Sequence, residues 1–302
     1  MFTQDFRHIC IIISIISGVL RNSSSSLLKD QKTVKDVYGA IGSDVELPCE
    51  GRDGGEVEWK LNGLVVSSGP VLTLHNVSLK DQGNYTCQSL SGDHVLTAVL
   101  QLGYPPSPPV VQCWSPTYPL KVICSWTGES SPLLPTHYIT TYRDLKSEVH
   151  PCKRSSELVN ECVLEGLEEL FSSDPYLFNI TTVNPLGSTI RILPIVLEHI
   201  VKPDPPVNVR VTLLPRRKLS VEWDPPPTWL EHFPLKYTVH YSWHQNGSNR
   251  KITLGPFESK SMNISGLAAG RTYQIQISAK DFLDQGQSSS WSQPVNISLP
   301  SR

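Results

Sequence analysis

The chain has 302 residues with 26 basic and 28 acidic side chains, so its formal net charge is only -2. This balance excludes the broad positive surface that nonspecific binding to nucleic acid or to anionic lipid requires, and no nucleic-acid partner is expected. The length is sufficient for two or three domains of ordinary size.

The first 22 residues have the composition of a secretory signal peptide. Arg7 and His8 precede an apolar run over 9–20 that is short for a bilayer span. An uncleaved membrane anchor is the alternative. Removal of the leader would also remove Cys10 and leave six cysteines, the even number that a secreted disulfide framework needs.

Sites for N-linked glycosylation are spread over the whole length, which favours a secreted protein or the extracellular face of the plasma membrane. The asparagines in these Asn-x-Ser/Thr sequences are Asn22, Asn76, Asn84, Asn179, Asn246, Asn263 and Asn296. Beyond the leader no apolar run of about 20 residues follows that would make a membrane helix. We therefore expect a naturally soluble protein, a splice form or a sequence that lacks its anchor exon.

Proline clusters at 104–109 and 202–206 divide the rest of the chain, because consecutive prolines suit stiff connections better than strand interiors. The predicted domains are 33–103, 104–201 and 202–302. No long amphipathic helix appears, and alternating segments such as 237–241 and 273–278 predict strands with one buried face. The predicted fold class is all-β, with three β-sandwiches in tandem.

In the first domain Cys49, Trp59 and Cys87 have the spacing of an inter-sheet disulfide and the indole that packs on it. Tyr85 stands two residues before Cys87, where a tyrosine corner bonds back to the preceding turn. These positions predict an immunoglobulin-like domain.

The second domain contains Cys113, Cys124, Cys152 and Cys162. The short segment between the first two suits adjacent antiparallel strands, and Trp126 shares the strand face of Cys124, so it is predicted to be a core residue. A structural zinc site is disfavoured because the close Cys-x2-4-Cys spacing is missing and the compartment is oxidising, so no metal is expected.

The third domain is predicted to have a core that includes Trp223, Leu267 and Tyr273, as large apolar residues at strand positions usually do. Near its end stands a short serine-rich segment with one tryptophan. Its residues are Ser288, Ser289, Ser290, Trp291 and Ser292.

Together these features resemble the class I cytokine receptors, in which an immunoglobulin-like domain precedes two fibronectin type III modules. The resemblance implies the pairs Cys113 with Cys124 and Cys152 with Cys162. It extends over all three domains and narrows to the alpha-type receptors for interleukin-11 and ciliary neurotrophic factor. The segments that carry the narrower resemblance are 101–106, 109–111, 134–138, 142–143, 183–187, 201–206, 233–236 and 279–284.

The terminal segment departs from the Trp-Ser-x-Trp-Ser pattern of that family. Ser288 replaces the first tryptophan, and Gln276 stands where the family usually carries an arginine. We expect a degenerate motif in which Lys280 and Trp291 form the remaining cation–π contact, worth about 0.5–1 kcal/mol. We also expect the fibronectin core to compensate for the lost contacts.

The resemblance implies a ligand-binding alpha subunit that holds a four-helix, interleukin-11-like cytokine at the elbow between the two fibronectin modules. It also implies presentation of that cytokine to the shared signalling receptor of the interleukin-6 family. A few aromatic anchors ringed by polar residues would carry most of the binding energy. The expected cytokine-binding residues are Phe171, Trp229, Phe233, Phe282, Leu283 and Asp284.

Two other functions use the same modules. One is an adhesion protein, which the paired cysteines of the second domain disfavour, and the other is the soluble subunit of a secreted heterodimeric cytokine. Catalysis is not expected, because no Gly-x-Ser-x-Gly, His-Glu-x-x-His or phosphate-binding glycine loop is present, and no cofactor is implied.

Overall fold

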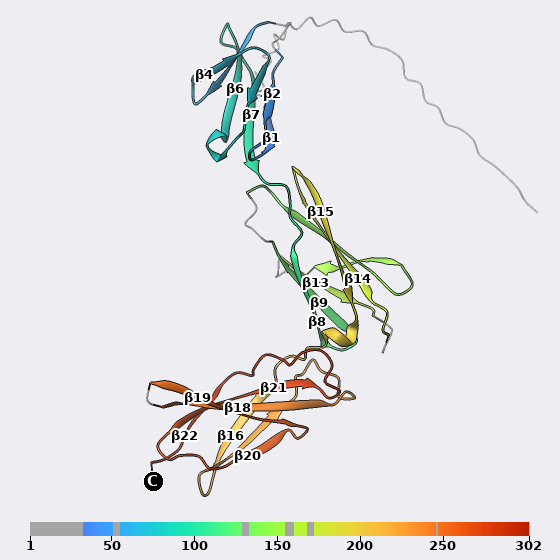
Figure 1. The fold of residues 1–302 in the computed structure, drawn as a ribbon, viewed down its shortest axis with the longest axis vertical. Coiled ribbons are helices and arrows are strands. Elements are labelled where there is room, and N and C mark those ends of the chain that lie inside the picture. Colours follow the sequence, from blue (N-terminus) through green and yellow to red (C-terminus); the bar gives the residue numbers. More distant parts are fainter. Residues whose placement is uncertain are drawn as a thin grey trace, which may run out of the picture.

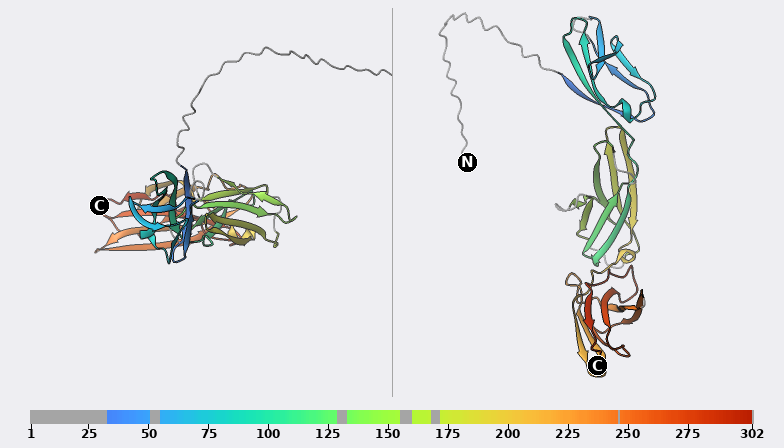
Figure 2. Two further views of the ribbon diagram at one scale, coloured as in Figure 1. Left: turned by 90° about the horizontal axis from the view of Figure 1, so that it is seen from above. Right: turned by 90° about the vertical axis from the view of Figure 1, so that its left-hand side faces the viewer.

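The computed structural model describes residues 33–50, 55–128, 133–154, 160–167, 172–245 and 247–301. Three β-sandwiches follow one another along the chain, with a bend between the second and the third (Figures 1 and 2). The predicted all-β fold is confirmed, because all the elements of the described residues are strands apart from two short 3₁₀ turns, Leu79–Asp81 and Leu197–Ile200.

The immunoglobulin-like module contains a five-stranded sheet, β1-β7-β6-β3-β4, and a two-stranded sheet, β2-β5. Its first strand runs parallel to β7, while the other pairs are antiparallel. The strands are β1 (Val34–Ala40), β2 (Val45–Pro48), β3 (Val57–Leu61), β4 (Leu64–Ser68), β5 (Val71–Leu74), β6 (Gly83–Ser89) and β7 (His94–Gly103).

The core of this module forms around the residues that the sequence singles out. Cys49 and Cys87 are joined by a disulfide, and Trp59 is fully buried beside them in the core. The Tyr85 hydroxyl donates a hydrogen bond of 2.8 Å to the Asp81 carbonyl, which is the predicted tyrosine corner.

The second module packs the sheet β11-β10-β14-β15 against the sheet β12-β13-β9-β8. The structure contains the Cys113–Cys124 and Cys152–Cys162 disulfides, and Trp126 is buried as predicted. The strands are β8 (Val110–Thr117), β9 (Lys121–Thr127), β10 (His137–Arg143), β11 (Val149–Pro151), β12 (Lys153–Arg154), β13 (Glu161–Glu165), β14 (Tyr176–Asn184) and β15 (Gly187–Ile195).

The third module packs the sheet β16-β17-β20 against β19-β18-β21-β22. Trp223, Leu267 and Tyr273 lie in its core, as predicted, and Trp223 packs edge-on against Tyr237. Burial raises the pKa of Tyr237 to about 12. The strands are β16 (Val207–Leu214), β17 (Lys218–Asp224), β18 (Leu235–Gln245), β19 (Ser248–Phe257), β20 (Ser261–Ile264), β21 (Thr272–Asp281) and β22 (Val295–Ser298).

Candidate functional site

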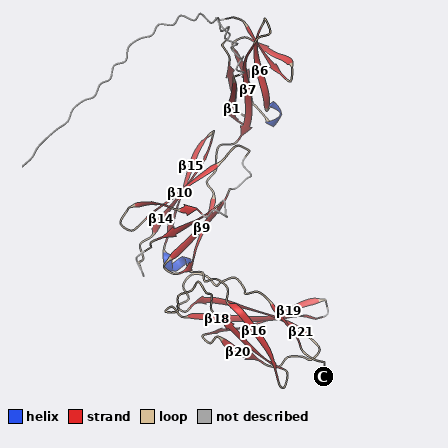
Figure 3. Ribbon diagram, turned by 180° about the vertical axis from the view of Figure 1, so that it is seen from behind, coloured by secondary structure: helices blue, strands red, loops and turns tan. Residues whose placement is uncertain are grey.

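The junction between the second and third modules is packed. Buried residues of both modules belong to one continuous hydrophobic cluster, and the 3₁₀ turn Leu197–Ile200 lies between the two sandwiches (Figure 3). Ser115 of β8 forms a β-bridge with Val201 of the linker, and its carbonyl accepts a hydrogen bond of 2.9 Å from the Lys202 amide. The linker is thus held to the second module by backbone hydrogen bonding.

Side chains also cross this junction directly. The Thr117 hydroxyl donates to the Thr228 carbonyl at 2.8 Å, and the rings of Tyr118 and Phe233 meet edge to face with centroids 5.8 Å apart. These contacts connect the loop after β8 to the loop between β17 and β18. They fix how the loops of the two modules face one another.

Gly286, in the loop after β21, allows the third module to contact the linker. Its φ is +60°, and a Cβ built on it would lie 2.0 Å from the Val201 carbonyl oxygen. The adjacent Gln287 amide donates to that same oxygen at 2.7 Å. A glycine is therefore required here both for backbone conformation and for space.

In the second module the loop between β10 and β11 lies at this end of the sandwich. The Asp144 carboxylate accepts a hydrogen bond from the Glu148 amide and contacts the His150 ring, both at 2.8 Å. The hydrogen bond with His150 is the main reason why the pKa of Asp144 lies below its usual value. The loop borders a hollow of about 340 Å³ that Tyr142 and Tyr176 also line.

Asp144, Glu148 and His150 also place their ligand atoms within 4.8 Å of one another, a grouping that the sequence did not indicate. The Asp144 carboxylate is already engaged by the loop backbone and by the imidazole. We assign the group to loop structure.

In the third module the loops before β18 and after β21 enclose a hollow of about 540 Å³. Trp229 lies in its wall but is only 9% exposed, and its indole nitrogen donates to the Phe233 carbonyl at 2.7 Å. Phe282 borders the same hollow and is 36% exposed, and Leu283 beside it is 68% exposed. Trp229 therefore supports the loop, whereas Phe282 and Leu283 present apolar surface.

Asp284 holds the tip of the loop after β21. Its carboxylate lies 2.6 Å from the Lys236 ammonium and 3.4 Å from that of Lys280, and the hydrogen bond to Lys236 chiefly lowers the pKa of Asp284. The Lys236 ammonium also stands 5.7 Å from the centre of the Phe282 ring. These contacts link the loop tip, and the exposed aromatic ring beside it, to β18 and β21.

Five of the six predicted cytokine-binding residues lie in the described part of the chain, in or beneath the loops at the junction. Phe233, Phe282, Leu283 and Asp284 lie in the two loops of the third module that flank the junction, with Trp229 beneath them. Phe171 lies outside the described residues. The sequence reasoning missed Tyr118 and Gly286, although a glycine after Asp284 in an inter-strand loop is a signal for a tight turn.

The serine-rich terminal segment packs along β21. The Ser289 and Ser292 hydroxyls are buried and accept hydrogen bonds from the Ala279 and Ile277 amides at 2.9 and 3.0 Å. The side-chain amide nitrogen of Gln276 donates to the Ser292 carbonyl. The segment therefore behaves as an additional edge of the sheet.

The prediction that Lys280 forms the cation–π contact with Trp291 is wrong in the identity of the cation. The cation over the Trp291 ring is Lys251 of β19, whose ammonium is 5.4 Å from the ring centroid, whereas Lys280 contacts Asp284. The ring of His240 lies 3.9 Å from that of Trp291, centroid to centroid.

The predicted glycosylation sites lie on four strands and one turn in the described part of the chain. Asn76 is in a turn, and Asn84, Asn179, Asn263 and Asn296 are on β6, β14, β20 and β22. Asn179 is half-buried and the other four are exposed. Asn22 and Asn246 lie outside the described residues.

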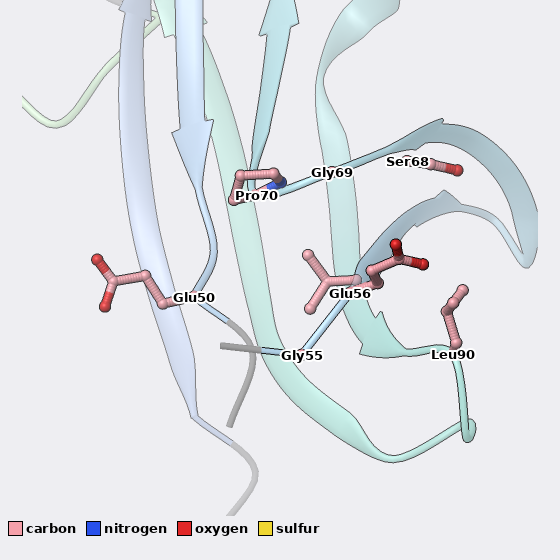
Figure 4. A pocket seen from close by; sticks show the side chains of 8 residues that line it. Glu50, Gly55, Glu56, Ser68, Gly69, Pro70 and Leu90 are labelled. Atoms are coloured by element: carbon pink, nitrogen blue, oxygen red, sulfur yellow. The ribbon is translucent and has the colours of Figure 1, made fainter. Parts of the chain in front are cut away.

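A hollow of about 660 Å³ in the immunoglobulin-like module brings no reactive groups together. Its wall includes Glu50 and Glu56, whose carboxylates point in opposite directions (Figure 4). Within the described residues, no helix has the length and apolar character needed to cross a membrane.

The arrangement defines an extracellular protein-recognition chain, in which an immunoglobulin-like module precedes two fibronectin type III modules whose loops meet at a packed junction. Residues 109–195 match the family described as IL27B N-terminal FN3 domain, and residues 204–298 match the fibronectin type III domain.

Several curated proteins are similar over most of the chain. Interleukin-27 subunit beta of Homo sapiens is 36% identical over 221 residues, which cover 71% of this chain and 93% of that protein. Interleukin-11 receptor subunit alpha of Homo sapiens is 34% identical over 279 residues, covering 84% of this chain but 64% of the relative. Ciliary neurotrophic factor receptor subunit alpha of Canis lupus familiaris is 33% identical over 271 residues, covering 84% and 70%.

The chain therefore belongs to the class I cytokine receptor family, together with interleukin-27 subunit beta and the ciliary neurotrophic factor receptor alpha subunits. It is a cytokine receptor chain and not an enzyme.

Proposed function

We propose that the chain is a ligand-binding alpha subunit that holds an interleukin-11-like four-helix cytokine at the junction of its two fibronectin modules. The bound cytokine would then be presented to the shared signalling receptor of the interleukin-6 family. We place the protein outside the cell, either secreted or attached to the membrane surface.

The observation that carries the proposal is the ordered apolar surface on the loops of the third module. Phe282 and Leu283 are exposed, and the ion pair of Asp284 with Lys236 links the tip of their loop to β18. Exposed aromatic residues on a preordered loop lose little conformational entropy on binding, which is the property of energetic anchors in protein interfaces. The junction contacts keep this loop in a fixed relation to the second module.

Binding should be tested with the secreted chain and a panel of interleukin-6-family cytokines, followed by addition of the shared signalling receptor to each complex. Phe282→Ala should weaken binding by about 2 kcal/mol, roughly thirtyfold, without changing the melting temperature. Leu213→Ala is the matched control, since Leu213 is similarly exposed, at 40%, on β16 and outside the loops at the junction.

The possible outcomes test the assignment of Phe282 and the receptor function separately. If the parent chain binds a cytokine and Phe282→Ala binds equally well, Phe282 is not part of the site. If the parent binds no cytokine on the panel, the receptor function itself is not supported.

A second candidate is favoured by the comparison with interleukin-27 subunit beta, whose name describes a subunit of a cytokine and nearly all of whose length this chain covers. In that role the chain would leave the cell already assembled with a helical partner. Co-expression that yields a complex stable through purification, with no exchange against added cytokine, would favour this role over reversible binding.

A further inference from the structure

The outer face of the sheet β11-β10-β14-β15 in the second module is unexpectedly apolar. Ile139, Ile190 and Ile192 are 59%, 59% and 61% exposed, and Val149 on the edge strand is 60% exposed. The solvent face of an antiparallel sheet normally carries polar side chains. Contiguous exposed apolar surface usually marks a site that something covers.

Strand register places these residues near one asparagine. Asn179 of β14 lies opposite Ile192 of β15 and opposite Thr141 of β10. Two residues further on, Thr181 lies opposite both Ile190 and Ile139. Directly opposed residues have Cβ atoms about 5 Å apart, so Asn179 lies next to Ile192 and one row away from Ile139 and Ile190 on the same face.

Asn179, Ile180 and Thr181 form an acceptor sequence for N-linked glycosylation. Ile180 is fully buried, so the strand turns both Asn179 and Thr181 outward. The Asn179 side chain is half-buried, and its carbonyl oxygen is buried without a hydrogen-bond partner. A glycan would be attached through the amide nitrogen of the same group.

We infer that an N-linked glycan on Asn179 covers this aliphatic face. The sugar rings of a glycan have C–H faces that pack on aliphatic side chains, while their hydroxyls point to water. One attachment point on the face is sufficient to shield Ile139, Ile190 and Ile192 together. The inference does not depend on the proposed function, because it concerns a sheet face and not the junction loops.

Two other acceptor asparagines of the described residues have polar neighbours instead. Asn263 on β20 lies opposite Ser220, and Asn296 on β22 lies opposite Gln274. A glycan at either position would extend from a strand without isoleucine opposite it. Asn263→Gln is therefore the matched control for removal of the Asn179 glycan.

The test uses the full chain secreted from mammalian cells. Mass spectrometry of glycopeptides should show that Asn179 is occupied. Asn179→Gln and Thr181→Ala both abolish the acceptor sequence, and each should raise the fluorescence of a hydrophobic-surface dye roughly threefold and cause concentration-dependent self-association. Thr181→Ser, which keeps the acceptor sequence, and Asn263→Gln should behave like the parent chain.

A rescue variant covers the case in which loss of the glycan prevents secretion. Ile190→Thr combined with Ile192→Thr, added to Asn179→Gln, should restore either secretion or the monomeric state, because it removes the aliphatic surface itself. The inference is overturned if secreted parent protein carries no glycan on Asn179. It is also overturned if Asn179→Gln leaves dye binding and association unchanged, or if the isoleucine substitutions rescue nothing.

Discussion

The second and third modules share a fibronectin type III fold but are stabilised by different means. In the second module Cys113–Cys124 joins the neighbouring strands β8 and β9, and Cys152–Cys162 joins the residue between β11 and β12 to β13. The sequence of the third module contains no cysteine. There the buried hydroxyls of Ser289 and Ser292 attach the terminal segment to β21.

The difference shows that one sandwich can replace covalent cross-links by hydrogen bonds to its own backbone. A disulfide limits the unfolded chain, whereas a buried hydroxyl satisfies an amide that would otherwise lose its partner on folding. The two modules should therefore respond differently to reduction, to pH and to single substitutions.

The largest expected effect is on the second module. Replacing both Cys113 and Cys124 by alanine should lower the free energy of unfolding by about 3 kcal/mol, because a short closed loop is no longer imposed on the unfolded chain. Differential scanning calorimetry of the full chain should show one transition shifted down, with the transition of the third module unchanged. A coincident shift of both transitions would contradict independent stabilisation of the modules.

In the third module Ser292→Ala should lower the free energy of unfolding by about 1–3 kcal/mol, because the backbone amide of Ile277 loses its side-chain acceptor. Ser290→Ala is the control, since Ser290 is exposed in the same segment. Chemical denaturation followed by tryptophan fluorescence would measure both. Equal stability of the two variants would mean that the serine hydroxyls do not support the sheet.

The pH response should also differ between the modules. Burial chiefly lowers the pKa of His240 below 6.5, aided by the charge of Lys251, while a hydrogen bond with Gln276 acts in the opposite direction. As the pH falls, His240 is therefore protonated at a higher pH in the unfolded chain than in the folded one. The contribution of neutral His240 to the free energy of unfolding is fully present above pH 6.5. It is lost as the pH falls from there through the folded-state pKa.

His240→Gln should flatten this dependence, and thermal melts between pH 7.5 and about pH 5 would detect the change. His244→Gln is the control, because His244 is exposed at the far end of the same strand. If the parent and His240→Gln melts fall in parallel with pH, His240 is not the responsible group.

The sequence predicted what depends on local spacing and missed what depends on register. Cys49, Trp59, Tyr85 and Cys87 lie close enough along the chain for their spacing to define a sandwich core. The contact between Thr117 and Thr228 joins residues 111 positions apart, and nothing in either local sequence indicates it. The candidate binding loops were predicted from family resemblance, whereas the place of Gly286 against Val201 needed the structure.

The cation over Trp291 illustrates the same limit and provides the smallest expected effect. Lys280 was the expected partner because it lies on β21, but Asp284 engages it, and β19 brings Lys251 to the ring through its pairing with β18. Lys251→Met should reduce the stability of the third module by about 0.5–1 kcal/mol and alter Trp291 emission, since the methionine keeps the aliphatic stem but removes the charge. Lys280→Met should leave the emission unchanged. The reverse result would restore Lys280 as the partner and would mean that β19 does not hold its ammonium over the ring.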